Sequence, residues 1–440
     1  MKIKLHERSL ITLGCTFEEN DWGACQFPKV YAMADGHLAA TLHMGEDSIR
    51  DYGMANPWFY SENEGKSWAP ANEDLGKKCG VRLSDGSFLR AVTRQSIDVT
   101  DMQIPKDLFG DVLPGEPLPH PRKAPSANAL PETFCRFYLW DDLLVRLYHV
   151  DALPEGLLDK SFLMERYDPK TNQTEQYLAP LDWPYMPVYT MTFHNGRTYM
   201  SRPSLWGNMK VAPDGSIWAP HYAYGSDPQN GGFAPYLFCY IFRSTDEGRH
   251  FSLHSYIPFC PDTSFDSLAF FREGYCEPEV EFMPDGSVIM LIRCCGTTHG
   301  GPNFGPLYFT RSTDGGATWA PLRPFDKSGV IPQLCRLGCG VTLAAYGRPG
   351  IFVRMSSDPS GLVWDEPVEV MTPKDRTSLG NAPGNPKQTR FHAWEGSCCN
   401  LGLAVIDERR AIISYSDFYV PDENGVKRKG CFTQVVEIGE

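Results

Sequence analysis

A surplus of positive charge and a long apolar run are both missing from this sequence. Of its 440 residues, 41 are Lys or Arg and 54 are Asp or Glu, which gives a net charge of −13. Because phosphate binding needs a basic face, we expect no nucleic-acid partner. No stretch approaches the roughly 18 apolar residues of a membrane span, so we expect no membrane partner either.

A targeting pattern is missing from the beginning of the sequence. Its residues, MKIKLHERSLITLG, contain no continuous apolar segment of the kind found in secretory signal peptides. The 14 cysteines include two adjacent pairs, Cys294-Cys295 and Cys398-Cys399, and adjacent cysteines rarely bond to each other. Free thiols in a reducing cytoplasm fit this pattern, so we expect a cytoplasmic protein.

The spacing typical of a zinc site is missing as well. Cys335 and Cys339 stand close together, but no second Cys or His pair of familiar zinc spacing accompanies them. We therefore expect neither a metal nor another cofactor.

Turn-forming and aromatic residues are abundant. The chain has 40 Gly and 36 Pro, and aromatic residues make up 12% of it. Many turns together with many aromatic residues favour an all-β structure. The length suffices for one large domain or two ordinary ones.

One short turn is written several times along the chain. RSTDGGATW (311–319) has near-copies in RSTDEGRHF (243–251) and YSENEGKSW (60–68), and SSDPSGLVW holds Asp358 in the same role. In such a turn the Asp can cap backbone N–H groups, the Gly takes a strained conformation and the aromatic residue packs between strands. These needs are structural, so we expect the turn to hold strands together rather than to perform chemistry.

A second repeated signal is an Asp-Gly turn between apolar runs, which predicts a hairpin. It occurs in MADGHLAATL (33–42), LSDGSFLRAV (83–92), APDGSIWAP (212–220) and MPDGSVIMLI (283–292). Together the two turns define a four-stranded unit, and a repeat of such units indicates a propeller. Units start near residues 24, 77, 200, 275, 331 and 396. We therefore predict a single domain over residues 1–440, a six-bladed β-propeller of four-stranded antiparallel blades.

The second unit is lengthened by a Pro-rich insertion at about residues 105–132. This insertion is either an ordered loop over a pocket or a plain surface excursion.

The repeated turn is that of the Asp-box, or BNR, repeat, and with the six units it makes the chain resemble the sialidase superfamily. CEPEVEFMPDGSVIMLIR (276–293) is similar to the family segment that carries an active-site Glu and a substrate-binding Arg. The resemblance implies that Glu277 assists catalysis and that Arg293 binds a substrate carboxylate. YGRPGIFVRMSSD (346–358) resembles the segment with the third arginine of the family, which places that role on Arg348.

The chain departs from the family at two positions. Gln26, in CQFPKV, stands where the family has the first arginine of its clamp. The last unit has no Tyr at the position of the family nucleophile, where the alignment reaches Asn400. For the acid/base Asp of the family the chain offers Asp51 and Asp47, and spacing favours Asp51.

Aligning the units on their Asp-Gly turns predicts which residues share one end of a central tunnel. The strand starts are Gln26, Lys77, Trp206, Glu277, Ile331 and Asn400, and the far ends of the next strands are His43, Arg94, Tyr222, Arg293, Arg348 and Tyr415. We take Arg94, His43 and His221 as further candidates for substrate binding. The alternative is that the arginines are structural counter-ions and the histidines are satisfied polar residues. His392 and Glu395 are candidates to replace the lost groups.

Two classes of function fit these residues. The first is an exo-acting glycosidase in which Glu277 and Asp51 flank the bond of a terminal sugar. That sugar could be acidic because two clamp arginines remain, and loss of the Tyr makes an inverting reaction conceivable. The second class is a polysaccharide lyase or a glycan-binding protein, and a lyase could use His221, Tyr222 and Arg94. Either way the expected partner is an oligosaccharide or glycoconjugate, and the sequence leaves the sugar, the linkage and the oligomeric state open.

Overall fold

The structure is a computed structural model of the chain. It describes residues 1–16, 18–20, 23–45, 49–102, 104, 144–193, 195–267, 269, 272–295, 305–348, 350–371 and 397–439. These residues form strands and turns, and the helices among them are short 3₁₀ turns: η1 (Ile49–Asp51), η2 (Leu75–Lys78) and η4 (Val150–Ala152). The all-β prediction is therefore confirmed. Over the same ranges, no helix is long and apolar enough to cross a membrane.

Three of the sheets are antiparallel and four-stranded, each built around strands consecutive in the chain. The first, in the order β2-β3-β4-β5, contains β2 (Gln26–Ala32), β3 (Leu38–His43), β4 (Trp58–Ser61) and β5 (Ala69–Ala71). Another contains β22 (Val330–Arg336), β23 (Thr342–Gly347), β24 (Ile351–Ser356) and β25 (Val368–Met371). A third, in the order β1-β28-β27-β26, contains β1 (Lys2–Leu13), β26 (Gly402–Val405), β27 (Arg410–Pro421) and β28 (Lys427–Gly439).

The largest sheet joins three antiparallel groups. They are β6 (Val81–Arg82), β7 (Phe88–Val92), β10 (Ser161–Asp168) and β11 (Gln173–Asp182); β14 (Lys210–Val211), β15 (Ile217–Ser226), β16 (Phe233–Ser244) and β17 (Phe251–Ile257); and β18 (Gly274–Phe282), β19 (Val288–Cys295), β20 (Leu307–Ser312) and β21 (Arg323–Asp326). Short parallel pairings, Leu181 with Phe251 and Leu237 with Gly274, connect one group to the next. The three groups therefore count as one sheet of 12 strands although each is a four-stranded unit.

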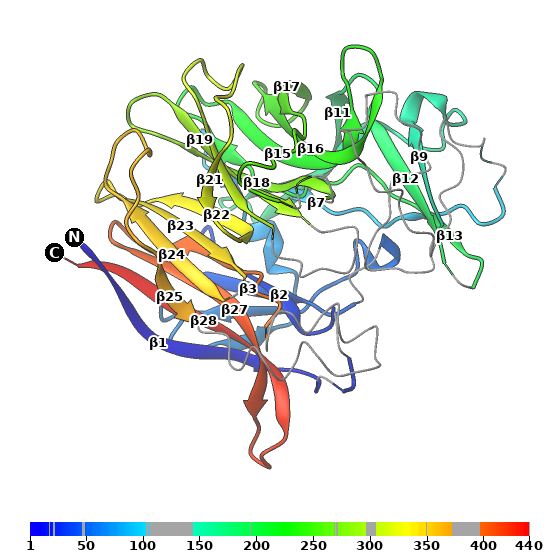
Figure 1. The fold of residues 1–440 in the computed structure, drawn as a ribbon. Coiled ribbons are helices and arrows are strands. Elements are labelled where there is room, and N and C mark those ends of the chain that lie inside the picture. The colour runs from blue at the N-terminus through cyan, green and yellow to red at the C-terminus, as the bar shows by residue number, and fades with distance from the viewer. Residues whose placement is uncertain are drawn as a thin grey trace.

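A further small sheet was not expected from the sequence. Its order is β8-β13-β12-β9, with β8 (Ile97–Asp98), β9 (Leu144–His149), β12 (Pro187–Thr192) and β13 (Thr198–Met200). Its strands come from either side of β10 and β11, so it interrupts the second unit, and Figure 1 shows it at one side of the molecule. The predicted insertion at 105–132 lies outside the described residues.

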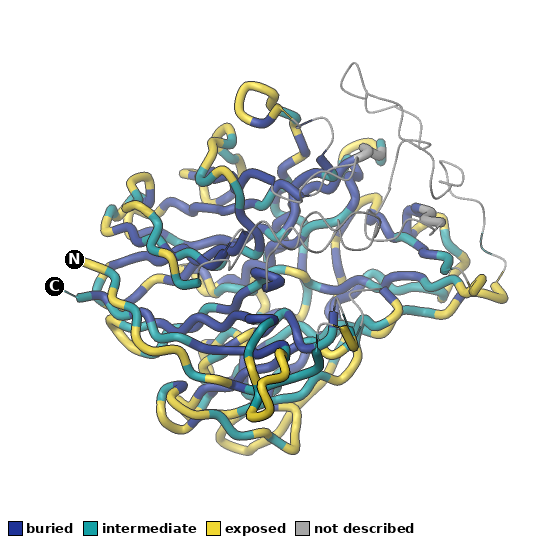
Figure 2. The backbone as a smooth tube through the Cα atoms, turned by 60° about the horizontal axis from the view of Figure 1, so that its bottom comes forward, coloured by how far each residue is buried: buried dark blue, intermediate teal, exposed yellow. Residues whose placement is uncertain are grey.

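The core lies between neighbouring sheets. Val353 of β24, Ile413 of β27 and Ile438 of β28 belong to one apolar cluster, so the sheets that hold them pack face to face. A larger cluster joins Phe162 of β10 to Phe242 of β16. Figure 2 shows the same division, with buried segments along the strands and exposed ones mostly at the turns and outer edges.

The Asp-Gly hairpins have one shared geometry. In the turn between β18 and β19, the Met283 N–H donates to the Ser287 carbonyl at 2.8 Å and the Gly286 N–H donates to the Met283 carbonyl at 3.0 Å. The Asp285 carboxylate accepts the Ser287 N–H, and Gly286 has a φ of 84°, which favours glycine. The turns around Gly36, Gly86, Gly215 and Gly340 share the backbone pattern.

The repeated Ser-x-Asp-x-Gly turn is held by its own side chains. In the copy after β20, the Gly316 N–H donates to the Ser312 hydroxyl at 2.8 Å and the Thr318 N–H donates to the Asp314 carboxylate at 3.0 Å. Hydrogen bonds from Thr318 lower the pKa of Asp314. The Trp319 indole N–H donates to Ser255 on β17 at 3.0 Å, so the turn also connects two neighbouring groups of strands.

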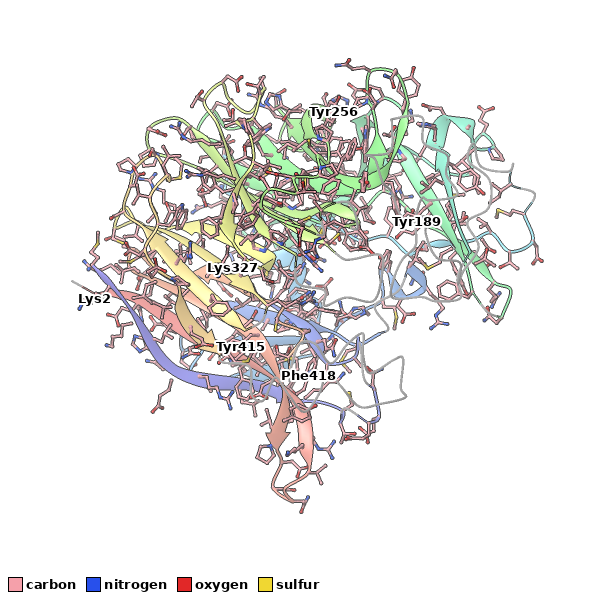
Figure 3. The ribbon with its side chains drawn as sticks, in the orientation of Figure 1. Lys2, Tyr189, Tyr256, Lys327, Tyr415 and Phe418 are labelled. Atoms are coloured by element: carbon pink, nitrogen blue, oxygen red, sulfur yellow. The ribbon has the colours of Figure 1, made fainter. Side chains whose placement is uncertain are left out.

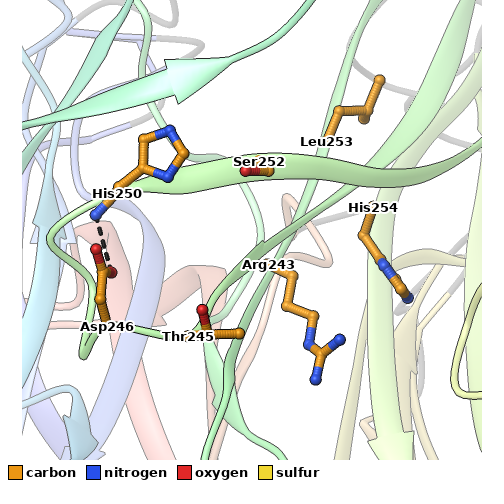
Figure 4. Close-up of a pocket in the computed structure, with 7 residues that line it drawn as sticks. All are labelled: Arg243, Thr245, Asp246, His250, Ser252, Leu253 and His254. Carbon is orange, nitrogen blue, oxygen red and sulfur yellow. Dashed lines mark hydrogen bonds between the residues drawn. The ribbon is translucent and has the colours of Figure 1, made fainter.

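A surface pocket of about 220 Å³ lies beside the copy of this turn that holds Asp246 (Figure 4). The His250 N–H donates to Asp246 at 3.0 Å, and the His250 ring lies 3.1 Å from Asp182. Arg243 pairs with Asp214, and a ring nitrogen of His254 lies 2.8 Å from the Gly315 carbonyl. The charged groups that line this pocket thus serve the turn and its neighbours, as expected for a structural role.

Replacing Asp314 with Ala tests that role. We expect Asp314→Ala to lower the midpoint of thermal unfolding by a few degrees, because the turn loses its capping side chain. Turnover per folded molecule should stay close to that of the wild type, whereas a large loss in a folded variant would place the turn at the substrate. Glu366→Ala, an exposed substitution beyond the β24 turn, is the control and should leave the midpoint unchanged.

Candidate functional site

The site is built on three strands that share an irregular start. In β2, β18 and β22 the antiparallel register shifts by one residue directly around a proline: Pro28, Pro278 and Pro332. The residue before each proline has a positive φ: Phe27 at 53°, Glu277 at 51° and Ile331 at 43°. Such backbone is strained for a residue with a side chain and is often kept where it positions a functional group.

This geometry corrects the predicted alignment of the strand starts. Before the bulge, Gln26 pairs with His43 and Cys276 pairs with Arg293. Gln26 is therefore the counterpart of Cys276, and Phe27 is the counterpart of Glu277. The prediction that aligned Gln26 with Glu277 was wrong by one residue, because it allowed the spacing to the turn to vary and a shift of one residue reverses the face of a strand.

The strand ends need a similar correction. Val330 pairs with Gly347 as Cys276 pairs with Arg293, so Arg348 lies one residue beyond the position of Arg293. A positive φ of 57° at Arg348 redirects the chain there, and the side chain is buried, with 3% of the residue exposed.

Glu277 and Arg293 are in direct contact. An N–H of the Arg293 guanidinium donates to one Glu277 oxygen, and the Ile331 backbone N–H donates to the other at 2.7 Å. Their side chains are only 12% and 11% exposed. The carboxylate is thus held from its own sheet and from β22 of the next one, which fixes its orientation.

Arg348 lies within electrostatic range of this pair. Burial and the positive charge of Arg293 lower the pKa of Arg348, and the negative charge of Glu277 acts in the opposite direction. Arg348 also directly follows Gly347, which pairs with Val330 beside the Ile331 that binds Glu277. The structure thus brings three of the sequence candidates, Glu277, Arg293 and Arg348, into one largely buried cluster.

Tyr222 of β15 also belongs to this neighbourhood. Burial and the nearby charge of Glu277 raise the pKa of Tyr222 well above its usual range, so its phenol stays protonated. It packs against the cluster that holds Cys276 and Cys295. Tyr222 occupies the place in its hairpin that Arg293 occupies in its own, counted from the turn glycines Gly215 and Gly286.

A buried polar network surrounds the two glutamates of β18 that follow Glu277, Glu279 and Glu281. The Asn208 amide donates to Glu279 at 3.0 Å and to Gln333 at 2.9 Å. The Lys210 ammonium donates to Glu281 at 2.7 Å and lies 3.4 Å from Glu279. These contacts join β14, β18 and β22.

Glu279 is the titratable group of this network. Burial raises the pKa of Glu279 to about 7 against the opposing charge of Lys210, and Glu281 adds to the rise. Lys29 of β2 also acts on it: the residue as a whole is exposed, but burial around its ammonium lowers the pKa of Lys29, while the charge of Glu279 opposes this effect.

The stability of the protein should therefore depend on pH through Glu279. Below pH 7 the folded state holds a proton that an unfolded Glu releases near pH 4.5, so this contribution is full in acid and is lost as the pH rises through 7. We expect the unfolding free energy of the wild type to fall relative to that of Glu279→Gln between pH 5 and pH 8, by on the order of 3 kcal/mol. Urea unfolding of both proteins at several pH values measures this, and parallel curves would contradict it.

The remaining candidates lie in other surroundings. Arg94 forms a two-point ion pair with Asp159, at 2.7 and 2.8 Å, and no contact among the described residues joins it to Glu277. The His43 ring lies 5.8 Å from that of Phe27, so it borders the irregular start of β2. Asp51 ends η1, lies 3.7 Å from the Arg50 guanidinium and is 16% exposed. Asp47, His392 and Glu395 lie outside the described residues.

The His221 ring is stacked on that of Tyr222, with centroids 6.2 Å apart, and its other ring neighbours are apolar aromatic residues. Its ring packs edge-on against Phe162 and Trp183, with centroids 6.3 and 5.7 Å away, and burial lowers its pKa to about 3. Of the proposed lyase residues, the described contacts bring His221 and Tyr222 together but do not join Arg94 to them, because Arg94 pairs with Asp159. Tyr415 lies with Phe418 on β27, where it donates to Gln434 at 3.0 Å (Figure 3).

One partner of Glu277, the Ile331 N–H, was not predicted from the sequence. The Ile331 N–H is a backbone group, and no side-chain motif indicates it. The signal that could have revealed it is the residue-Pro pair repeated at the start of β2, β18 and β22. Tyr222 was identified, but as a base for a different reaction.

Comparison with known proteins gives a likeness of fold. No protein-family model and no curated protein matches the sequence. Among solved structures, a protein of unknown function from Dyadobacter fermentans is similar, with a TM-score of 0.53 and 17% identity over 99% of each chain. More distant are an α-L-arabinanase from Penicillium chrysogenum (TM-score 0.46, 11% identity, 97% of this chain and 98% of that one) and a Hadza microbial sialidase (TM-score 0.44, 12% identity, 93% of this chain and 65% of that one). The first likeness shows a shared fold, so the function of this chain has to be argued from its own residues.

Proposed function

We propose that this protein is an exo-acting glycosidase that removes a terminal acidic sugar from a glycan. The observation that carries the proposal is the buried cluster of Glu277, Arg293 and Arg348. Planar guanidinium groups suit a carboxylate, because each can donate two parallel hydrogen bonds. A carboxylate-bearing sugar held there would place its ring next to Glu277.

The proposed architecture is a single domain over residues 1–440, closed into a six-bladed propeller with this cluster near its axis. In support, the first strands of successive units contact each other: β2 with β26, β26 with β22, and β22 with β18. The series continues from β18 to β15 and from β14 to β6. Side chains at the starts of these strands would then face a shared centre.

In the proposed reaction, Asp51 and Glu277 divide the acid and base roles. Asp51 donates a proton to the glycosidic oxygen as the bond from that oxygen to the anomeric carbon breaks. A water molecule forms the new bond to the anomeric carbon, and Glu277 takes its proton. The configuration at the anomeric carbon is inverted, because a single displacement occurs on the face opposite the leaving group.

Tyr222 offers a second route to the same products. Glu277 could take the phenolic proton of Tyr222, whose oxygen would then attack the anomeric carbon and form a covalent intermediate. Water would cleave this intermediate, and the configuration would be retained. The proximity of Tyr222 to Glu277 favours this route, whereas the raised pKa of Tyr222 disfavours it.

The test is a screen of unlabelled oligosaccharides with detection by mass. We expect release of a terminal acidic monosaccharide, and proton NMR of the first product formed distinguishes inversion from retention. A product that is lighter by one water and absorbs in the near ultraviolet would instead indicate a lyase. Binding without any product would indicate a glycan-binding protein, and either result would overturn the proposal.

Arg293→Lys is expected to act mainly on binding. Lysine keeps the positive charge but loses the planar pair of donors, so KM should rise by about tenfold while kcat changes less. Arg249→Lys is the matched control, because Arg249 also pairs with a glutamate, Glu175, but on the surface. A fall in kcat at unchanged KM would show that Arg293 acts in the transition state instead.

A further inference from the structure

The segment that leads into β14 runs beside β18 in the same direction. Asn208 contacts Glu279 and Lys210 contacts Glu281, so a step of two residues along one chain matches two along the other. Trp206 comes two residues before Asn208, on the side of this segment that leads toward the start of β18. The bulge of β18 between Cys276 and Glu279 means that no register pairs Trp206 with Glu277.

Trp206 is accessible to solvent. The residue is 39% exposed, although it directly precedes a buried network. The segment is held close to β15, since a side-chain carbon at Gly207 would lie 2.2 Å from the Pro220 carbonyl oxygen. An indole on a fixed backbone presents its face to solvent with little loss of freedom.

The ring of Tyr52 contacts the ring of Trp206. The two rings lie 4.8 Å apart and cross at 63°, which is an edge-to-face contact. Tyr52 follows Asp51, the proposed proton donor, directly in the chain. Trp206 therefore connects the segment before β14 with the element that carries Asp51.

We propose that Trp206, supported by Tyr52, is the platform on which the sugar on the leaving-group side of the cleaved bond stacks. The apolar face of a sugar ring packs well on an aromatic ring, and this large apolar surface is open to solvent. The leaving-group side is assigned because the platform adjoins Asp51, which protonates the leaving oxygen. The inference rests on the proposed glycosidase function and adds the class of leaving group, a sugar ring.

The experiment measures kcat/KM of the wild type and of Trp206→Ala with two substrates. One is the acidic glycan found in the screen, with a sugar as leaving group, and the other is the methyl glycoside of the same acidic sugar. We expect kcat/KM to fall about tenfold for the glycan and less than about twofold for the methyl glycoside, with Trp206→Phe recovering most of the loss. Phe265→Ala, which removes another aromatic residue that is 39% exposed, is the control.

An equal loss on both substrates, or no loss on the glycan, would overturn the platform. If the screen finds no hydrolysed glycan, the glycosidase proposal fails separately. In that case, sugar binding by Trp206 is tested separately. Lactose, cellobiose and arabinobiose are titrated into the wild type and into Trp206→Ala while tryptophan fluorescence is recorded. A saturable change that only the wild type shows supports the platform, and identical curves overturn it.

Discussion

Glu277→Gln is expected to lower kcat by a factor of about 100 or more. The amide keeps the shape of the carboxylate and can still accept the Ile331 N–H, but it cannot take a proton from water or from Tyr222. The measurement is the rate of sugar release at saturating glycan concentration. Because the substitution also removes the charge that Arg293 contacts, substrate affinity has to be measured separately.

Glu175→Gln is the matched control for this variant. Glu175 also accepts two hydrogen bonds from an arginine, Arg249, at 2.8 and 2.7 Å, but on an exposed strand. It should leave kcat unchanged. If Glu277→Gln remains folded and turns over as fast as the wild type, Glu277 has no role as acid or base, and the buried cluster is a structural ion pair.

The second large effect is expected from Asp51→Asn, and it should depend on the leaving group. A sugar leaves poorly without a proton, so kcat for the natural type of glycan should fall about 100-fold or more. A nitrophenol leaves readily as the anion, so kcat for a nitrophenyl glycoside of the same acidic sugar should fall less than about tenfold. Steady-state rates with the two substrates give the comparison.

Asp74→Asn is the control, because it makes the same substitution at a carboxylate with a structural role. Asp74 caps η2 by accepting the Gly76 N–H at 2.7 Å and pairs with Arg90, so its replacement tests a structural carboxylate. It should change the rates with both substrates alike. An Asp51→Asn variant that loses equal activity on both substrates would assign Asp51 to positioning, and the proton donor would have to be another group.

Local signals in the sequence predicted the all-β class and the individual hairpins, because the information they carry is local. Asp-Gly turns fix hairpins through a positive φ and a hydrogen bond to a nearby N–H, as at Asp285 and Gly286. The small sheet of β8, β9, β12 and β13 was missed because its strands come from distant parts of the chain and one of them has two residues. Pairing between such segments leaves no periodic pattern.

The site was predicted only in part for a related reason. Glu277 and Arg293 were found together because they lie on paired strands of one hairpin, whose register follows from the turn. The spacing to the turn was allowed to differ by one residue between β2 and β18, so Gln26 was aligned with Glu277 where Phe27 is the counterpart. The partner of Arg94, Asp159, lies beyond a long insertion, so no spacing rule connects them.

The pairing of β1 with β28 has a consequence for how the protein is made. These strands come from residues 2–13 and 427–439, and they lie side by side at the edge where both ends of the chain meet (Figure 1). During synthesis β1 leaves the ribosome before β28 and has to wait for this partner, for roughly 20 to 80 s at about 5–20 residues per second. Until then its strand edge is open to other nascent chains, so assistance by a chaperone would matter most at this stage.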